Sequence, residues 1–70
     1  MMNYAEVAVD APAGYSRTFT YSFPINTDIV LGQMVKVPFG NRVVAGIVVN
    51  LKEHSEGIET REILGSFYSQ

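Results

Sequence analysis

The sequence predicts a mainly β protein, a small curled antiparallel sheet or partly open barrel of about four or five strands. Three observations support this fold class. Apolar residues recur mostly at every second position, which is the period of a half-buried strand. Strongly amphipathic helical spacing is absent. Gly and Pro separate the alternating segments at short intervals, and a chain of 70 residues leaves room for one curled sheet.

The first predicted strand covers Tyr4–Val9. Its alternate apolar residues share one face: Ala5, Val7 and Val9. Asp10–Gly14 follows as a loop because it contains Pro and Gly. Thr18–Phe23 is the next strand, since aromatic residues alternate there with Ser and Thr. We expect Tyr21 and Phe23 in the core. Pro24 ends this strand because proline has no N–H to donate.

A hairpin is predicted over Val35–Val49, after a turn at Ile25–Gln33 in which Gly32 has a positive φ. Gly40-Asn41 suits a type II′ turn. Counting back from this turn pairs Phe39 with Arg42 and Pro38 with Val43, a pair without mutual hydrogen bonds. The missing N–H of Pro38 then faces away from the partner strand. We therefore expect an uncovered sheet edge, and a candidate binding surface, at the Pro38 end.

The second arm of the hairpin, Val43–Leu51, is apolar on both faces, which predicts a central strand buried on both sides. Gly46 falls opposite Val35, where it would admit a neighbouring aromatic side chain or permit a bend. Lys52–Glu59 is polar and contains a glycine, so it is predicted to be a surface loop. Thr60–Tyr68 forms either a last strand or a short helix, and the β-rich surroundings favour the strand.

Composition narrows the classes of function. The 47% hydrophobic content allows a core, and the lack of cysteine excludes disulfides and is compatible with a reducing compartment. The net charge of −2 argues against broad binding to nucleic acid, although a few cations could converge: Arg17, Lys36, Arg42 and Arg61. No apolar run approaches the length of a membrane span and the first residues do not resemble a signal peptide, so we expect a cytoplasmic protein without membrane contact.

No residue pattern indicates catalysis, a metal or a cofactor. His54 is the sole histidine and lies in a charged loop, so it is expected to be solvated. The neighbouring acids are predicted to be hydrated surface groups: Glu53, Glu56, Glu59 and Glu62. No serine has a positioned base and no Gly-rich phosphate loop is present. The chain by itself is therefore predicted not to be an enzyme.

Two aromatic residues leave two interpretations open. Phe19 follows Arg17 and Phe39 lies at the hairpin tip beside Gly40, so each could be buried or exposed for stacking on a base. Arg17 alone is typical of a solvated charge at the end of a strand.

One combination of motifs resembles a known family. In order, the chain contains Arg17-Thr-Phe-Thr-Tyr21, Gly32, Val35-Lys-Val-Pro-Phe-Gly40 and Gly46-Ile-Val-Val49. Together they resemble the N-terminal 3′-end DNA-binding domain of PriA-type primosomal protein N′, the bacterial replication-restart helicase. The resemblance runs from about Val7 to Leu64. It implies that residues 1–70 are one domain cut from a helicase whose other domains carry the ATP, Mg²⁺ and zinc sites, and whose hydrolase activity serves primosome assembly.

The resemblance also implies a site. In the family this domain holds the 3′-terminal nucleotide of the nascent leading strand at a stalled fork, largely independently of base identity. The matching positions here are Phe19, Thr20, Gly40 and Arg61, with Arg17 and Phe39 beside them. The family usually has an acidic residue where this chain has Thr20, so a hydroxyl replaces the carboxylate acceptor for the 3′-hydroxyl. Gly40 leaves room for the sugar, and a valine there is expected to block the pocket with little loss of fold.

Other partners and other classes stay open. Through its parent, the domain would meet further primosome proteins and the single-strand binding protein. The alternative is an SH3-like barrel that docks proteins, with the Pro38 edge accepting a partner strand. A third interpretation is a structural fragment without a site of its own.

Overall fold

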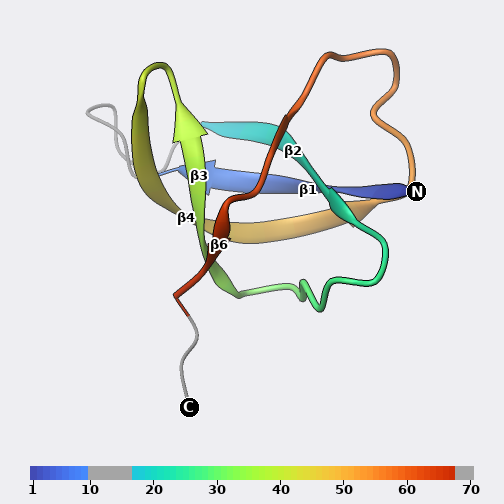
Figure 1. Ribbon diagram of the computed structural model, residues 1–70, viewed down its shortest axis with the longest axis horizontal. Helices are drawn as coiled ribbons and strands as arrows, with labels where there is room; N and C mark the ends of the chain where they lie inside the picture. The colour runs from blue at the N-terminus through green and yellow to red at the C-terminus, as the bar shows by residue number, and fades with distance from the viewer. Residues whose placement is uncertain (10–16, 68–70) are drawn as a thin grey trace.

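The structure, a computed structural model, describes residues 1–9 and 17–67. One 6-stranded sheet has the order β5-β2-β1-β4-β3-β6 and curls into a half-barrel (Figure 1). The strands are β1 Met2–Val9, β2 Thr18–Pro24, β3 Met34–Phe39, β4 Arg42–Lys52, β5 Arg61–Glu62 and β6 Gly65–Ser66. The predicted curled β fold is confirmed.

The predicted loop at Asp10–Gly14 lies outside the described residues. Among the described residues, no helix is long and apolar enough to cross a membrane.

The segment from Arg61 to Ser66 connects the two edges of the sheet. Its first half, β5, pairs in parallel with β2, and its second half, β6, pairs antiparallel with β3 (Figure 1). The N–H of Ile63 donates to the carbonyl oxygen of Ser22 at 2.9 Å, and the N–H of the next residue, Leu64, donates to that of Lys36 at 2.8 Å. The single last strand expected from the sequence is therefore two short ones, because consecutive residues bond to opposite edges.

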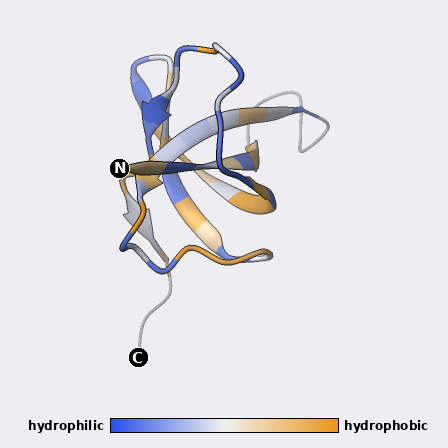
Figure 2. Cartoon of the chain, turned by 90° about the vertical axis from the view of Figure 1, so that its right-hand side faces the viewer, coloured by the Kyte–Doolittle hydropathy of each residue, from blue (hydrophilic) through white to orange (hydrophobic). Residues whose placement is uncertain are grey.

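The concave face of the sheet holds the core. Its buried apolar side chains alternate along the strands, as predicted for β1 and β2: Ala5, Val7, Val9, Tyr21, Phe23, Val35, Val37, Val44 and Val48. In Figure 2, hydrophobic and hydrophilic residues are interspersed along the ribbon of the curled sheet. Ile29 from the β2–β3 connection completes the core. Gly32 has the predicted positive φ, +83°.

The hairpin has the predicted register, with Phe39 opposite Arg42 and Pro38 opposite Val43. Gly40 has a φ of +63° and Asn41 does not have a positive φ, which is the signature of a type II′ turn. No described strand pairs with the other side of Pro38. The edge is nevertheless not uncovered: Pro38 is buried, and its carbonyl oxygen accepts a 2.7 Å hydrogen bond from the Tyr21 hydroxyl.

Strand β4 is central, between β1 and β3, but the prediction that it is buried on both faces is wrong. Val43 is 60% exposed and Val49 is 50% exposed. Apolar residues on both faces are typical of strands covered by a second layer. The described residues form a single curled sheet, so the convex face of β4 meets solvent.

Gly46 lies opposite Val35 as predicted, but the expectation that it admits an aromatic ring is wrong. A Cβ atom at this position would clash with Cγ1 of Val7 and lie 3.1 Å from the carbonyl oxygen of Ala8. The missing side chain therefore lets β1 approach β4, next to a register shift between Glu6 and Val7.

Replacing Gly46 with alanine should reduce the free energy of unfolding by about 1–3 kcal/mol, because an added methyl overpacks the β1–β4 contact. Urea unfolding followed by fluorescence of the tyrosines measures this. Gly65→Ala is the matched control, since a Cβ atom there meets only the Cε of Lys36 at an ordinary 3.7 Å. Equal stability of the two variants would contradict the packing role of Gly46.

Candidate nucleic-acid interface

A hollow of about 260 Å³ lies beside the tip of the β3–β4 hairpin. It is lined by residues of β2, of the hairpin and of the segment that leads into β5: Phe19, Thr20, Tyr21, Pro38, Phe39, Gly40, Glu59 and Arg61. The structure thus brings together five of the residues selected from the sequence, which are Phe19, Thr20, Phe39, Gly40 and Arg61. Arg17 does not line the hollow and is exposed just before β2.

Two aromatic rings form one wall of this hollow. The ring centroids of Phe19 and Phe39 lie 5.3 Å apart with an interplanar angle of 66°, an edge-to-face pair. Both side chains pack against the core and both are only partly buried. Each ring is therefore buried on one side and exposed on the other, so both interpretations, burial and exposure, apply in part. The exposed part of such rings is a surface on which a base can stack.

Arg61 supplies the cation. Its Nη1 donates a 2.8 Å hydrogen bond to the carbonyl oxygen of Gly40, which ties β5 to the hairpin tip. A guanidinium has five N–H donors, so this bond leaves others that can reach a phosphate oxygen. The remaining cations do not converge here: Lys36 lies 5.6 Å from the ring centroid of Phe67, and Arg42 does not line the hollow.

Gly40 borders open space, since a Cβ atom there would have no atom within 4 Å. A side chain at this position would therefore project into solvent or into the hollow. Its φ of +63° is unfavourable for any side chain and most of all for a β-branched one. The expectation that valine at this position leaves the fold nearly intact is wrong, because it overlooks this backbone conformation.

Three lining residues were not selected from the sequence. Tyr21 was assigned to the core, Glu59 to the hydrated surface and Pro38 to an open edge, yet all three border the hollow. One of them could have been found from strand periodicity, since Tyr21 is two residues after Phe19 on the same strand. Burial raises the pKa of Tyr21, against a smaller opposing effect of Arg61, so its phenol stays neutral and donates to Pro38.

Beside Thr20, on the next strand, a carboxylate is held by three donors. Glu6 pairs directly with Thr20 across β1 and β2. The hydroxyl of Thr18 donates to Oε1 of Glu6 at 2.8 Å and that of Thr20 to Oε2 at 2.9 Å. Nζ of Lys52 lies 3.1 Å from Oε2. The Thr18 hydrogen bond, followed by Lys52 and Thr20, lowers the pKa of Glu6 against the opposing effect of burial. Sequence patterning did not indicate this cluster.

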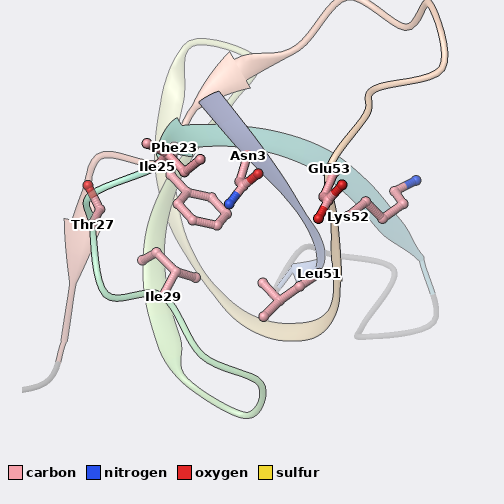
Figure 3. A pocket seen from close by; sticks show the side chains of 8 residues that line it. All are labelled: Asn3, Phe23, Ile25, Thr27, Ile29, Leu51, Lys52 and Glu53. Carbon is pink, nitrogen blue, oxygen red and sulfur yellow. The ribbon is translucent and has the colours of Figure 1, made fainter. Parts of the chain in front are cut away.

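A second hollow, of about 310 Å³, lies at the opposite end of β2 (Figure 3). Its apolar floor consists of Phe23, Ile29 and Leu51. Lys52 borders it, but the ammonium group points away and binds Glu6. None of the site residues selected from the sequence line this hollow. Its greater volume therefore does not make it the better candidate for binding DNA.

The single histidine and the acids near it in the sequence, which were considered as catalytic or metal-binding groups, lie at the surface. His54 is exposed, and so are Glu53, Glu56 and Glu62. Among residues 1–9 and 17–67 no group of His, Cys, Asp or Glu side chains could hold a metal ion. The hollow itself contains one acid and one base, Glu59 and Arg61, so its charges nearly balance.

Partly exposed aromatic rings and a cation beside one hollow are features that proteins use to bind single-stranded nucleic acid. A comparison with protein families identifies the particular family. Residues 6–69 match the PriA 3′ DNA-binding domain (3′BD). The match covers nearly the whole chain, and the chain belongs to this family of DNA-binding domains. Comparisons with curated proteins and with solved structures found no match.

The hydrogen-bonded state of Glu6 makes stability depend on pH. Its pKa is lower in the folded protein than its ordinary value of 4.5, so the unfolded chain binds the proton more tightly. The stabilisation is present above pH 4.5 and is lost as the pH falls through the folded pKa. Glu6→Gln should unfold at lower urea concentration than the wild type at pH 7, and the two midpoints should converge as the pH falls through the folded pKa of Glu6. A difference that persists at acid pH would contradict this assignment.

Proposed function

We propose that the hollow beside the hairpin tip binds the 3′-terminal nucleotide of a DNA strand. One observation carries the proposal. Residues that are distant in the chain and that the family resemblance assigns to such a site line one hollow: Phe19, Thr20, Phe39, Gly40 and Arg61. Membership of the 3′ DNA-binding domain family supports DNA as the ligand.

The physical features fit a short footprint. A base would stack on the exposed part of Phe19 and Phe39, which tolerates any base because every base has a π face. The sugar would lie over Gly40, where no side chain intrudes. Arg61 would bind one phosphate. With a net charge of −2 and a single cation lining the hollow, the chain is suited to hold a terminus and poorly suited to follow a long backbone.

The biological setting is part of the proposal. We infer that the DNA is the nascent leading strand at a stalled replication fork, and that the domain serves a cytoplasmic replication-restart helicase. The ATP, Mg²⁺ and zinc sites, and contacts with other primosome proteins and the single-strand binding protein, would belong to the other domains of that parent. The support for this setting is the family match together with the motifs quoted above.

A protein-docking role by strand addition has less support. Such docking needs an open sheet edge. The edge of β2 pairs with β5, and the edge of β3 pairs with β6 over Val35 and Lys36. Beyond that, the carbonyl oxygen of Pro38 already accepts the hydrogen bond from Tyr21. These contacts favour the DNA-binding function over strand addition.

The first test compares termini. A single-stranded oligonucleotide with a free 3′-hydroxyl should bind more tightly than the same strand with a 3′-phosphate, and more tightly than a circular strand of equal composition, because only the first offers an unblocked terminus. Fluorescence anisotropy or calorimetry at low salt measures the three affinities. Equal affinities for the three ligands would refute end recognition.

The second test concerns the cation. Arg61→Gln should weaken binding of every sequence about equally and reduce the slope of log K against log salt by about one, since one phosphate contact is lost. Arg42→Gln is the matched control, because Arg42 is an exposed arginine beside the same turn that does not line the hollow. An identical loss of affinity in both variants would show that general charge, and not the hollow, binds the DNA.

A further inference from the structure

We infer that Tyr21 is a positioning residue of the proposed DNA site, because its hydroxyl holds the hairpin tip where Phe39 meets Phe19 and the two rings form one wall of the hollow. This inference rests on the proposed function and deepens it, since it names the residue that keeps the stacking surface assembled. Strand periodicity places the ring of Tyr21 in the core, where the residue is 4% exposed, but gives no role to its hydroxyl.

The carbonyl oxygens along the outer edge of β3 show what this hydroxyl replaces. Every second carbonyl of the strand points away from β4, as antiparallel pairing requires. The N–H of Phe67 donates to the carbonyl oxygen of Met34 at 3.1 Å. The N–H of Leu64 donates to that of Lys36 at 2.8 Å. The next carbonyl along this edge belongs to Pro38, which no described strand pairs with on this side.

Two side chains continue the series of hydrogen bonds where the backbone pairing ends. The Tyr21 hydroxyl donates to the carbonyl oxygen of Pro38 at 2.7 Å, and this hydrogen bond is buried. Two residues further along, Nη1 of Arg61 donates to the carbonyl oxygen of Gly40 at 2.8 Å. Tyr21 and Arg61 are themselves opposite each other in the parallel pairing of β2 and β5. The two side chains therefore tie the hairpin tip to one position in the sheet.

The two hydrogen bonds respond differently to a bound DNA strand. Arg61 is exposed, so a phosphate that binds its guanidinium can draw it away from the Gly40 carbonyl oxygen. The Tyr21 hydroxyl has one proton, which is already donated to Pro38 in a buried bond that a phosphate does not reach. Tyr21 is therefore the contact that still holds the tip when DNA is bound.

This contact acts on the stacking surface. Phe39 directly follows Pro38, whose carbonyl oxygen is held. Phe19 lies two residues before Tyr21 on β2, so one hydrogen bond fixes the hairpin relative to the strand that carries the second ring. Without the hydroxyl, the tip would also sample positions in which the two rings separate. Affinity would then fall in proportion to the fraction of molecules that keep the rings together.

The test removes one oxygen atom. Tyr21→Phe keeps the ring in the core and should weaken binding of a 3′-ended single strand about three- to tenfold, the range of one net hydrogen bond. The slope of log K against log salt should stay that of the wild type, since a phenol neutralises no phosphate. In the free protein, nuclear Overhauser effects between the rings of Phe19 and Phe39 should weaken.

Tyr4→Phe is the matched control, because Tyr4 lies on β1 and does not line the hollow. It should leave both the affinity and the nuclear Overhauser effects between the two rings unchanged. Circular dichroism at pH 7 shows that each variant is folded at the temperature of the binding measurement.

A double-mutant cycle separates positioning from general support of the fold. Phe39→Leu removes the ring that the hydroxyl positions, while Phe19 remains for a base to stack on. In that background Tyr21→Phe should cost no further affinity. If Tyr21 supported the site without acting through Phe39, the two losses would add.

The outcomes distinguish the two proposals. A wild type that binds circular and 3′-ended strands equally overturns the proposed function, and the DNA-binding role of Tyr21 with it. A wild type that prefers free ends, with the same affinity in folded Tyr21→Phe, overturns only the role of Tyr21. An equal loss in Tyr4→Phe, unchanged nuclear Overhauser effects in Tyr21→Phe, or losses that add in the Phe39→Leu background also overturn it.

Discussion

The hydrogen bonds of Ile63 and Leu64 to opposite edges of the sheet are the constraint on which the rest of the structure depends. One residue bonds to β2 and the next to β3, so two strands at opposite ends of the order β2-β1-β4-β3 are held side by side. Without this bridge the sheet would be a four-stranded antiparallel sheet with two free edges, at β2 and β3. With it, part of each edge is paired, at Tyr21 and Ser22 on β2 and at Val35 and Lys36 on β3, which hinders pairing with other chains there.

The candidate site is a consequence of that closure. Phe19 on β2 and Phe39 on β3 meet edge to face only because the two edges are brought together, and Arg61 reaches the carbonyl oxygen of Gly40 from the start of the same bridge. In the middle of the sheet, the missing side chain of Gly46 lets β1 approach β4 closely. The fold therefore builds its hollow from backbone constraints first, and the aromatic and charged side chains are positioned by them.

Electrostatics sets the kind of binding that this hollow can support. One arginine faces one glutamate there, and a second carboxylate, Glu6, is partly neutralised by Lys52 on the adjacent face. Such a balance gives little long-range attraction to a polyanion, so the proposed binding of a DNA terminus would depend on short-range contacts: a stacked base and a sugar over a glycine. The acidic composition and membership of a DNA-binding family are compatible for this reason.

The sequence by itself determined the first four strands, the inward-facing residues of the first two, the hairpin register and five residues of the hollow, because period-2 patterning, turn chemistry and family motifs are local properties. Only the tertiary structure decided the covered edge at Pro38, the exposed convex face of β4, the valine beside Gly46 and the pairing of Glu6 with Thr20. Each of these depends on which strand lies next to which, and on the presence or absence of a second layer. Local sequence patterns specify neither the neighbouring strand nor a second layer, because contacts between residues far apart in the chain form only when the sheet curls and closes.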